Sequence, residues 1–282
     1  MGWTITEDVS AYERAAGEFL LSDPIRHTVL VTVLDRLLRQ GVTVFGDAAP
    51  HFGWWTTPGG EVAAAFFRTP PFGIVVSPLP FEAIAPLVRD YSAIDPALPA
   101  VSGPSDSARA VAEVWARSHG TAATLRRADR LYRLDDLVPP EPTPDGRGRL
   151  ATDRDRALAI EWLLEFTRDI GDPPPAHPDR MIDDRLTRDG LTLWEVDGTP
   201  VSMAGTGPAV AGTIRIAPVY TPKPLRARGF AAAATTFACR QALASGASHI
   251  MLFADLANPT STALYQRLGF RPLGDYDIYH LG

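Results

Sequence analysis

The segment PLRARGFAAAATT, residues 224–236, combines residue types that favour binding of a phosphate. Arg226 and Arg228 stand just before Gly229, and the alanines that follow predict a helix. The first N–H groups of a helix have no partner within it, and the helix dipole favours negative charge there. Gly229 lets the backbone approach an anion closely, and the arginines would bind phosphate oxygens. The alternative without a ligand is a basic turn capped by glycine.

A second segment, NPTSTALYQRLGF (residues 258–270), follows a buried-strand pattern. Asn258, Ser261 and Tyr265 are spaced by three and four residues, which places them on one side of a helix. Asn258 is a suitable N-cap and Gly269 a suitable residue just past the C-terminus. The alternative is a surface helix whose tyrosine packs against the sheet.

The elements around these segments predict an α/β fold. In the second half we expect a short strand ending near 152, a helix capped by Thr152 or Asp153 and ending near Asp169, and a helix over 178–188. Strands are expected at 191–196, 200–210 and 212–220, with a tight turn at Asp197-Gly198. The alanine-rich helix, a strand at 249–256, the Asn258 helix and a strand at 270–281 complete the order.

The first half predicts the same order of elements. Helices are expected over 8–21 and 25–40, strands over 51–57, 61–69 and 72–80, and then helix 81–92, strand 98–103, helix 105–119 and strand 130–137. Between the halves lies VPPEPTPDGRGR, whose prolines and glycines end regular structure. The predicted division is an N-terminal domain 1–137, a linker 138–147 and a C-terminal domain 148–282.

Composition narrows the class of protein. The 282 residues carry a net charge of −6, which argues against general nucleic-acid binding. No apolar run has the length of a membrane span, and the first residues have no signal-peptide pattern. The single cysteine, Cys239, excludes an intrachain disulfide, fits a cytoplasmic location and is expected to be a buried apolar residue. The scattered histidines predict no metal site.

The two segments together resemble the GNAT superfamily of N-acetyltransferases. RARGFA is similar to that family's pyrophosphate loop, Gln/Arg-x-x-Gly-x-Gly/Ala, and NPTSTALYQRLGF is similar to its Asn…Leu-Tyr…Gly-Phe segment. The resemblance covers residues 148–282 and implies a mixed, mostly antiparallel sheet flanked by helices. The first half resembles a degenerate copy, because IVVSPLPFEAIAPLV has no Arg-x-x-Gly and the helix at 105–119 has no Asn…Tyr pair. One working site is therefore expected, in the C-terminal half.

The resemblance also implies a role for each residue. Acetyl-CoA would be the acyl donor, with direct transfer to an amine and neither a metal nor an enzyme nucleophile. Tyr265 would protonate the departing thiolate. The other residues implied in cofactor binding are Val219, Tyr220 and Thr221 along the pantetheine, the loop Arg226, Ala227, Arg228, Gly229, Phe230 and Ala231 at the pyrophosphate, and Asn258 with Ser261 beside the cofactor arm.

The expected general base is absent from its usual strand. Many members of the family carry a glutamate there, whereas GTIRIAPVYTP has no acid. An amine must lose a proton before it attacks, so Glu195 and Asp255 are the candidates for the base. If they have no role as a base, Glu195 is a solvated strand residue and Asp255 is a loop or cap acid.

The acceptor is expected to be a small-molecule amine. A protein or peptide amine, and a non-catalytic regulator that binds acyl-CoA, are the alternatives. The loop 171–180, with three consecutive prolines, is expected to cover the acceptor. Four aromatic residues of the first half either line a cleft or pack in the core: Trp54, Trp55, Phe66 and Phe67. The chain is expected to be a monomer or a homodimer.

Overall fold

The computed structural model describes residues 1–282 and contains two compact units. Unit 1 comprises Met1–Leu131, Asp255–Ala257 and Gly274–Gly282. Unit 2 comprises Tyr132–Ala254 and Asn258–Leu273. None of the helices is both long enough and apolar enough to cross a membrane.

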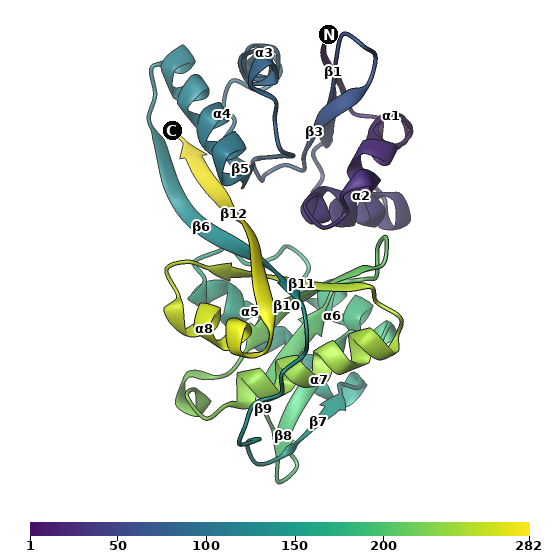
Figure 1. The fold of residues 1–282 in the computed structure, drawn as a ribbon, viewed down its shortest axis with the longest axis vertical. Coiled ribbons are helices and arrows are strands. Elements are labelled where there is room, and N and C mark those ends of the chain that lie inside the picture. The colour runs from purple at the N-terminus through teal and green to yellow at the C-terminus, as the bar shows by residue number, and fades with distance from the viewer. The chain divides into compact units, whose positions relative to one another are not determined.

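The same succession of elements occurs twice along the chain, as the sequence predicts (Figure 1). The first repeat contains β1 (Gly2–Thr6), α1 (Val9–Ser22), α2 (Thr28–Gln40), β2 (His51–Thr56), β3 (Val62–Arg68), β4 (Ile74–Val76), α3 (Phe81–Ser92), β5 (Ala100–Pro104), α4 (Ser105–His119) and β6 (Ala123–Leu134). The second contains β7 (Arg147–Leu150), the short 3-10 helix Asp153–Asp155, α5 (Arg156–Asp169), α6 (Pro178–Thr187), β8 (Leu191–Val196), β9 (Thr199–Thr206), β10 (Thr213–Tyr220), a second 3-10 turn (Lys223–Leu225), α7 (Phe230–Ala244), β11 (His249–Asp255), α8 (Pro259–Arg267) and β12 (Phe270–Leu281).

The sheet of unit 1 is mostly antiparallel and is completed by the C-terminus of the chain. Strands β1 to β4 pair in sequence order and antiparallel, and β4 pairs parallel with β5. The other edge of β5 pairs antiparallel with β12, where Tyr276 lies opposite Pro104 and His280 opposite Ala100. The compact units therefore differ from the predicted domains, because the end of β12 is hydrogen-bonded to the first repeat.

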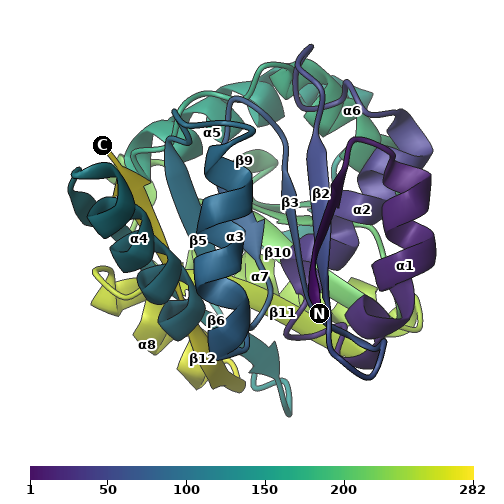
Figure 2. The same ribbon diagram turned by 90° about the horizontal axis from the view of Figure 1, so that it is seen from above.

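Helices α3 and α4 lie side by side against the sheet of unit 1 (Figure 2). Their apolar side chains, including Leu87 and Trp115, form one core cluster with β3, β4 and β5. Helices α1 and α2 form the other helical pair of unit 1. Tyr12 of α1 stacks on Phe52 of β2 with 5.1 Å between the ring centroids. Trp55, Phe66 and Phe67 are buried, so these three aromatic residues pack in the core rather than line a cleft.

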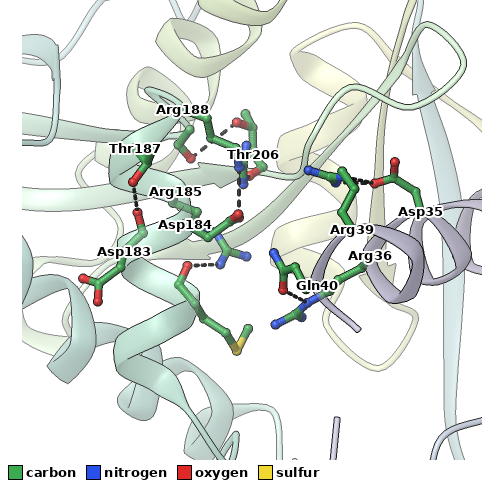
Figure 3. A network of polar contacts seen from close by, with 12 residues as sticks. Asp35, Arg36, Arg39, Gln40, Asp183, Asp184, Arg185, Thr187, Arg188 and Thr206 are labelled. Atoms are coloured by element: carbon green, nitrogen blue, oxygen red, sulfur yellow. Dashed lines mark hydrogen bonds and ion pairs between the residues drawn. The ribbon is translucent and has the colours of Figure 1, made fainter. Parts of the chain in front are cut away.

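The sheet of unit 2 has the order β11-β10-β9-β8-β7, with β6 on the free side of β11. Helices α5 and α6 cover one face through Trp162, Leu163 and Ile182. Helix α7 covers the other face through its alanines, and Cys239 is fully buried there, as predicted. Helix α6 is fastened to the end of β9 by Arg188, which bonds both Asp184 and the carbonyl of Thr206 (Figure 3).

Most predicted elements are confirmed, with three differences. The prediction omitted β1, although Trp3 and Ile5 alternate with polar residues, and the Trp3 ring packs 5.3 Å from that of Phe66. Strand β6 begins at Ala123, earlier than predicted, and β9 ends at Thr206 before a loop. These strands are defined by pairing with partners that are distant in the sequence, so local patterns place their ends poorly.

Candidate functional site

Strands β10 and β11 of unit 2 diverge partway along their length. They pair in parallel from Thr213 opposite His249 to Arg215 opposite Met251. Strand β10 continues to Tyr220 without further pairing on that side, and a register shift between Ile216 and Val219 interrupts its pairing with β9. A bulge bends a strand and re-aims its end. The end of β10 therefore has no strand partner on the β11 side, although side chains donate to the carbonyls of Ala217, Tyr220 and Thr221. An unpaired strand edge is where an extended ligand can add.

The loop after β10 forms a cradle of backbone N–H groups. Ala227 and Gly229 have left-handed backbones, with φ of +62° and +82°. Gly229 is the N-cap of α7, and the first helical hydrogen bond joins the Ala233 N–H to the Gly229 carbonyl. The N–H groups just before Ala233 therefore have no backbone acceptor and converge at the helix N-terminus. Such a geometry suits an anion, and the phosphate site at this loop stays a prediction.

Arg226 is held by the protein itself. Its guanidinium forms an ion pair with Asp169 of α5, donates from Nε to the Thr221 carbonyl at 2.9 Å and lies 5.7 Å from the centroid of the Tyr220 ring. Lys223 Nζ lies 3.2 Å from Asp169. The hydrogen bond from Arg226 is the main reason that the pKa of Asp169 is lowered. Arg226 thus fixes the loop to α5.

Arg228 differs from Arg226 in its surroundings. Its guanidinium lies 4.9 Å from the centroid of the Phe230 ring, and the residue is exposed. Arg228 is therefore the more accessible of the two predicted phosphate-binding arginines.

Tyr220, at the end of β10, is hydrogen-bonded to a carboxylate that sequence reasoning missed. Its hydroxyl donates to Glu165 Oε2 of α5 at 2.7 Å, and its ring packs 6.1 Å from that of Trp162. Burial, and then Glu165, raises the pKa of Tyr220 to about 12. The only signal in the sequence is that Glu165 and Asp169 are four residues apart, which places both on one face of α5.

Neighbouring Val219 and Thr221 are also held by the core. Val219 packs against the clusters beneath α7 and α8. Thr221 is buried, and its hydroxyl is 2.8 Å from that of Ser202 on β9. These contacts fix the backbone of the predicted pantetheine-binding segment.

Helix α8 carries the predicted Asn258, Ser261 and Tyr265. Asn258 caps the helix, because its side chain accepts from the Ser261 N–H at 3.1 Å. Tyr265 is buried in the cluster that also contacts Val219, and its ring is 5.9 Å from that of Phe270. Burial raises the pKa of the Tyr265 phenol, so the hydroxyl stays protonated at neutral pH and can donate.

Glu195 is not the solvated residue that the sequence suggests. It lies near the end of β8 with its side chain 6% exposed, and it accepts from Arg147 Nε at 2.8 Å and Arg149 Nε at 2.7 Å. The bonds from these two arginines lower the pKa of the carboxyl. A carboxylate that is buried and doubly paired is a weak proton acceptor, which argues against the base role.

Asp255, the other candidate base, ends β11. Its Oδ1 accepts from the Ala257 N–H at 2.8 Å and closes the turn that leads to α8. This local bond matches the alternative of a loop acid.

The corresponding region of unit 1 is closed. The contact between β4 and β5 continues to Gly103, where an added Cβ would lie 2.7 Å from the Val76 carbonyl oxygen. The following segment contains Pro78 and Pro80, which have no N–H groups to donate, and the N–H of Leu79 is bonded to Ser107 Oγ. Unit 1 therefore lacks both the diverging strands and the cradle found in unit 2.

Comparison with known proteins agrees with this geometry. Residues 157–270 match the family model described as the acetyltransferase (GNAT) family. The chain is similar in structure to a GCN5-related N-acetyltransferase from Sphaerobacter thermophilus, with 17% identity, 99% and 95% of the two chains covered and a TM-score of 0.64. It is also similar to one from Kribbella flavida, with 18% identity, 89% and 95% covered and a TM-score of 0.58.

A third solved structure has the same tandem arrangement. It is a tandem GNAT protein from the clavulanic acid biosynthesis pathway, with 11% identity, 99% of each chain covered and a TM-score of 0.59. At these identities the likeness concerns the fold. No curated protein matches the chain.

Proposed function

We propose that this chain, whose residues 157–270 match the acetyltransferase (GNAT) family model, transfers an acetyl group from acetyl-CoA to a primary amine of a small molecule. The observation that carries this proposal is the order of features in unit 2. The open edge of β10 is followed directly by the N–H cradle at Gly229. An amide-containing arm with a diphosphate at its end suits these two features together.

Residues of this chain would hold the donor in three places. The backbone of Val219, Tyr220 and Thr221 would pair with the amide-containing arm. The N–H groups of residues 227–231 would bind the diphosphate, with Arg228 adding charge, while the Arg226 N–H is bonded to the Lys223 carbonyl. Asn258 and Ser261 would contact the arm from the start of α8. When bound, the donor supplies an activated acetyl group as a thioester.

Tyr265 has the properties of a general acid. Its phenol is kept protonated by burial, and its hydroxyl makes no hydrogen bond with another residue. Donation of that proton would stabilise the thiolate that leaves when the acetyl group is transferred. The transfer requires no enzyme nucleophile, because the amine attacks the thioester directly.

Two other functions compete with this proposal. A protein or peptide amine would use the same chemistry with a larger acceptor. A regulator that binds acyl-CoA without turnover is favoured by one observation, the absence of an acid on β10.

Tyr265→Phe tests the proposal. We expect unchanged acetyl-CoA affinity by calorimetry, and a stability within about 0.5 kcal/mol of wild type because no protein hydrogen bond is lost. Thiol release with a panel of primary amines should fall roughly 10²- to 10⁴-fold, the usual contribution of a general acid.

The remaining outcomes separate the alternatives. Acetyl-CoA binding by the wild-type protein without turnover of any amine would favour the regulator. Turnover of peptides alone would favour the protein acceptor. Failure to bind acetyl-CoA at all would overturn the proposal.

A further inference from the structure

A carboxylate from the neighbouring helix lies at the end of β10, the strand that carries no acid. Glu165, on α5, reaches the end of β10 and accepts the Tyr220 hydroxyl at 2.7 Å through Oε2. Its other oxygen, Oε1, makes no hydrogen bond within the protein, and the residue is half-buried. Glu165 therefore combines a fixed position with a free proton-accepting atom.

Acid and base candidates lie on opposite faces of the same strand end. Tyr220 belongs to the core cluster beneath α5 and α6, whereas adjacent Val219 packs against the cluster that contains Tyr265. Successive side chains of a strand point to opposite faces. Glu165 thus lies on the α5 face of β10, and Tyr265 lies on the α8 face.

The free carboxylate oxygen of Glu165 suits a cationic ligand on the α5 face, and the neighbouring charges are engaged with other partners. Asp169, one turn further along α5, is a second carboxylate at the same strand end. Three cations also approach this end: Lys223 lies 3.2 Å from Asp169, Arg226 lies over the Tyr220 ring, and Arg185 of α6 donates to the Ala217 carbonyl at 3.2 Å. Arg226 and Lys223 are paired with Asp169, and Arg185 donates to the backbone carbonyls of Met181 and Ala217.

We infer that Glu165 accepts the proton of the attacking amine, that Tyr220 fixes its carboxylate, and that the acceptor is an amine that arrives as an ammonium ion. This inference rests on the proposed acetyl transfer. The ammonium gives one proton to Glu165 Oε1, and the freed nitrogen lone pair forms the C–N bond with the thioester carbonyl. The C–S bond breaks with its electron pair on sulfur, which takes a proton from Tyr265. The new amide nitrogen loses a proton that restores Tyr265, so one proton is released through Glu165 for each acetyl group transferred.

Glu165→Gln is the test, because glutamine can still accept the Tyr220 hydroxyl but cannot serve as a base at neutral pH. With glucosamine, putrescine and lysine methyl ester as probes, we expect kcat/KM at pH 7 to fall about 10²- to 10⁴-fold. The acetyl-CoA affinity should not change. The kcat/KM of the variant should rise about tenfold per pH unit up to the pKa of the amine, because hydroxide then removes the proton that the carboxylate no longer accepts. Hydroxylamine, which is already neutral at pH 7, should react equally with both proteins.

Two further measurements complete the design. Glu161→Gln, an exposed residue one turn earlier on α5, is the matched control and should leave activity unchanged. Independently of turnover, an ultraviolet titration with Tyr220→Phe as the reference should show that Glu165→Gln lowers the pKa of Tyr220, because the negative carboxylate that raises it is gone.

Each outcome decides the inference. Unchanged kcat/KM and pH profile in Glu165→Gln, with normal acetyl-CoA binding and turnover in the wild type, would overturn the role of Glu165 and leave the proposed function standing. An equal loss with hydroxylamine would show that Glu165 only supports the structure. Binding of acetyl-CoA without turnover of any probe would refute the base role together with amine transfer, and absence of acetyl-CoA binding would refute the proposed function itself.

Discussion

The effect of a methyl group at Gly229 can be estimated from the backbone and its neighbours. Gly229 has φ of +82°, a conformation that costs an L-residue about 1–2 kcal/mol. An added Cβ would lie 3.5 Å from Pro144 Cγ, an ordinary contact, so no steric term is added. The unfolded chain of the alanine variant has less conformational entropy to lose on folding, which offsets roughly 0.4–1 kcal/mol of this cost. Gly229→Ala should therefore lose only about 0.5–1.5 kcal/mol of folding free energy.

Binding should suffer more than stability. The strained left-handed turn would aim the N–H groups of the predicted phosphate site differently, and each hydrogen bond lost to a charged group costs about 1.5–3 kcal/mol. Loss of one such bond corresponds to a roughly 10- to 150-fold weaker acetyl-CoA affinity. Calorimetry with acetyl-CoA and urea unfolding followed by circular dichroism measure the two effects separately.

Ala227→Gly is the matched control in the same loop. Ala227 has φ of +62°, so glycine relieves strain there and should stabilise the protein by about 0.5 kcal/mol after the entropy of the unfolded chain is subtracted. Affinity within about threefold of wild type in Gly229→Ala would refute the cradle. A stability loss above about 3 kcal/mol would refute the estimate of free space around Gly229.

Two further predictions concern Arg147 and Arg149 of β7 and the two acids that they bind, Asp155 and Glu195. The hydrogen bond from Arg149 is the main cause that lowers the pKa of Asp155 to about 2, so Asp155 stabilises the fold above about pH 4, and this contribution is lost as the pH falls from about 4 to 2. Asp155→Asn should remove roughly 1–2 kcal/mol at pH 7, allowing for solvent screening, and flatten the acid limb of a urea-unfolding series; an unchanged acid limb would contradict this. Glu195→Gln should leave kcat/KM unchanged and lower Tm, because its bonds to Arg147 and Arg149 are weakened. A large loss of kcat/KM at unchanged Tm would restore Glu195 as the base.

The sequence predicted those features that depend on local chemistry. The glycine turn before the alanine-rich helix, the Asn258 cap and the helix ends are set by neighbours within one turn of the chain. The charged partners were not predictable in this way. Arg226 meets Asp169 across 57 residues, and Glu195 meets Arg147 across 48, so no periodicity connects them. Glu165 was missed for the same reason, because its significance comes from Tyr220 on another element.

The pairing of β12 with β5 has a consequence for how the protein folds during synthesis. Residues Tyr276–His280 are synthesised after every other strand described here, yet they form the neighbour of β5, which precedes them by more than 170 residues. Until then β5 has an open edge with unpaired backbone groups, which can pair with other chains. Loss of residues 276–280 would thus expose the edge of β5, and a fragment cut at the Pro-rich linker would expose the same edge.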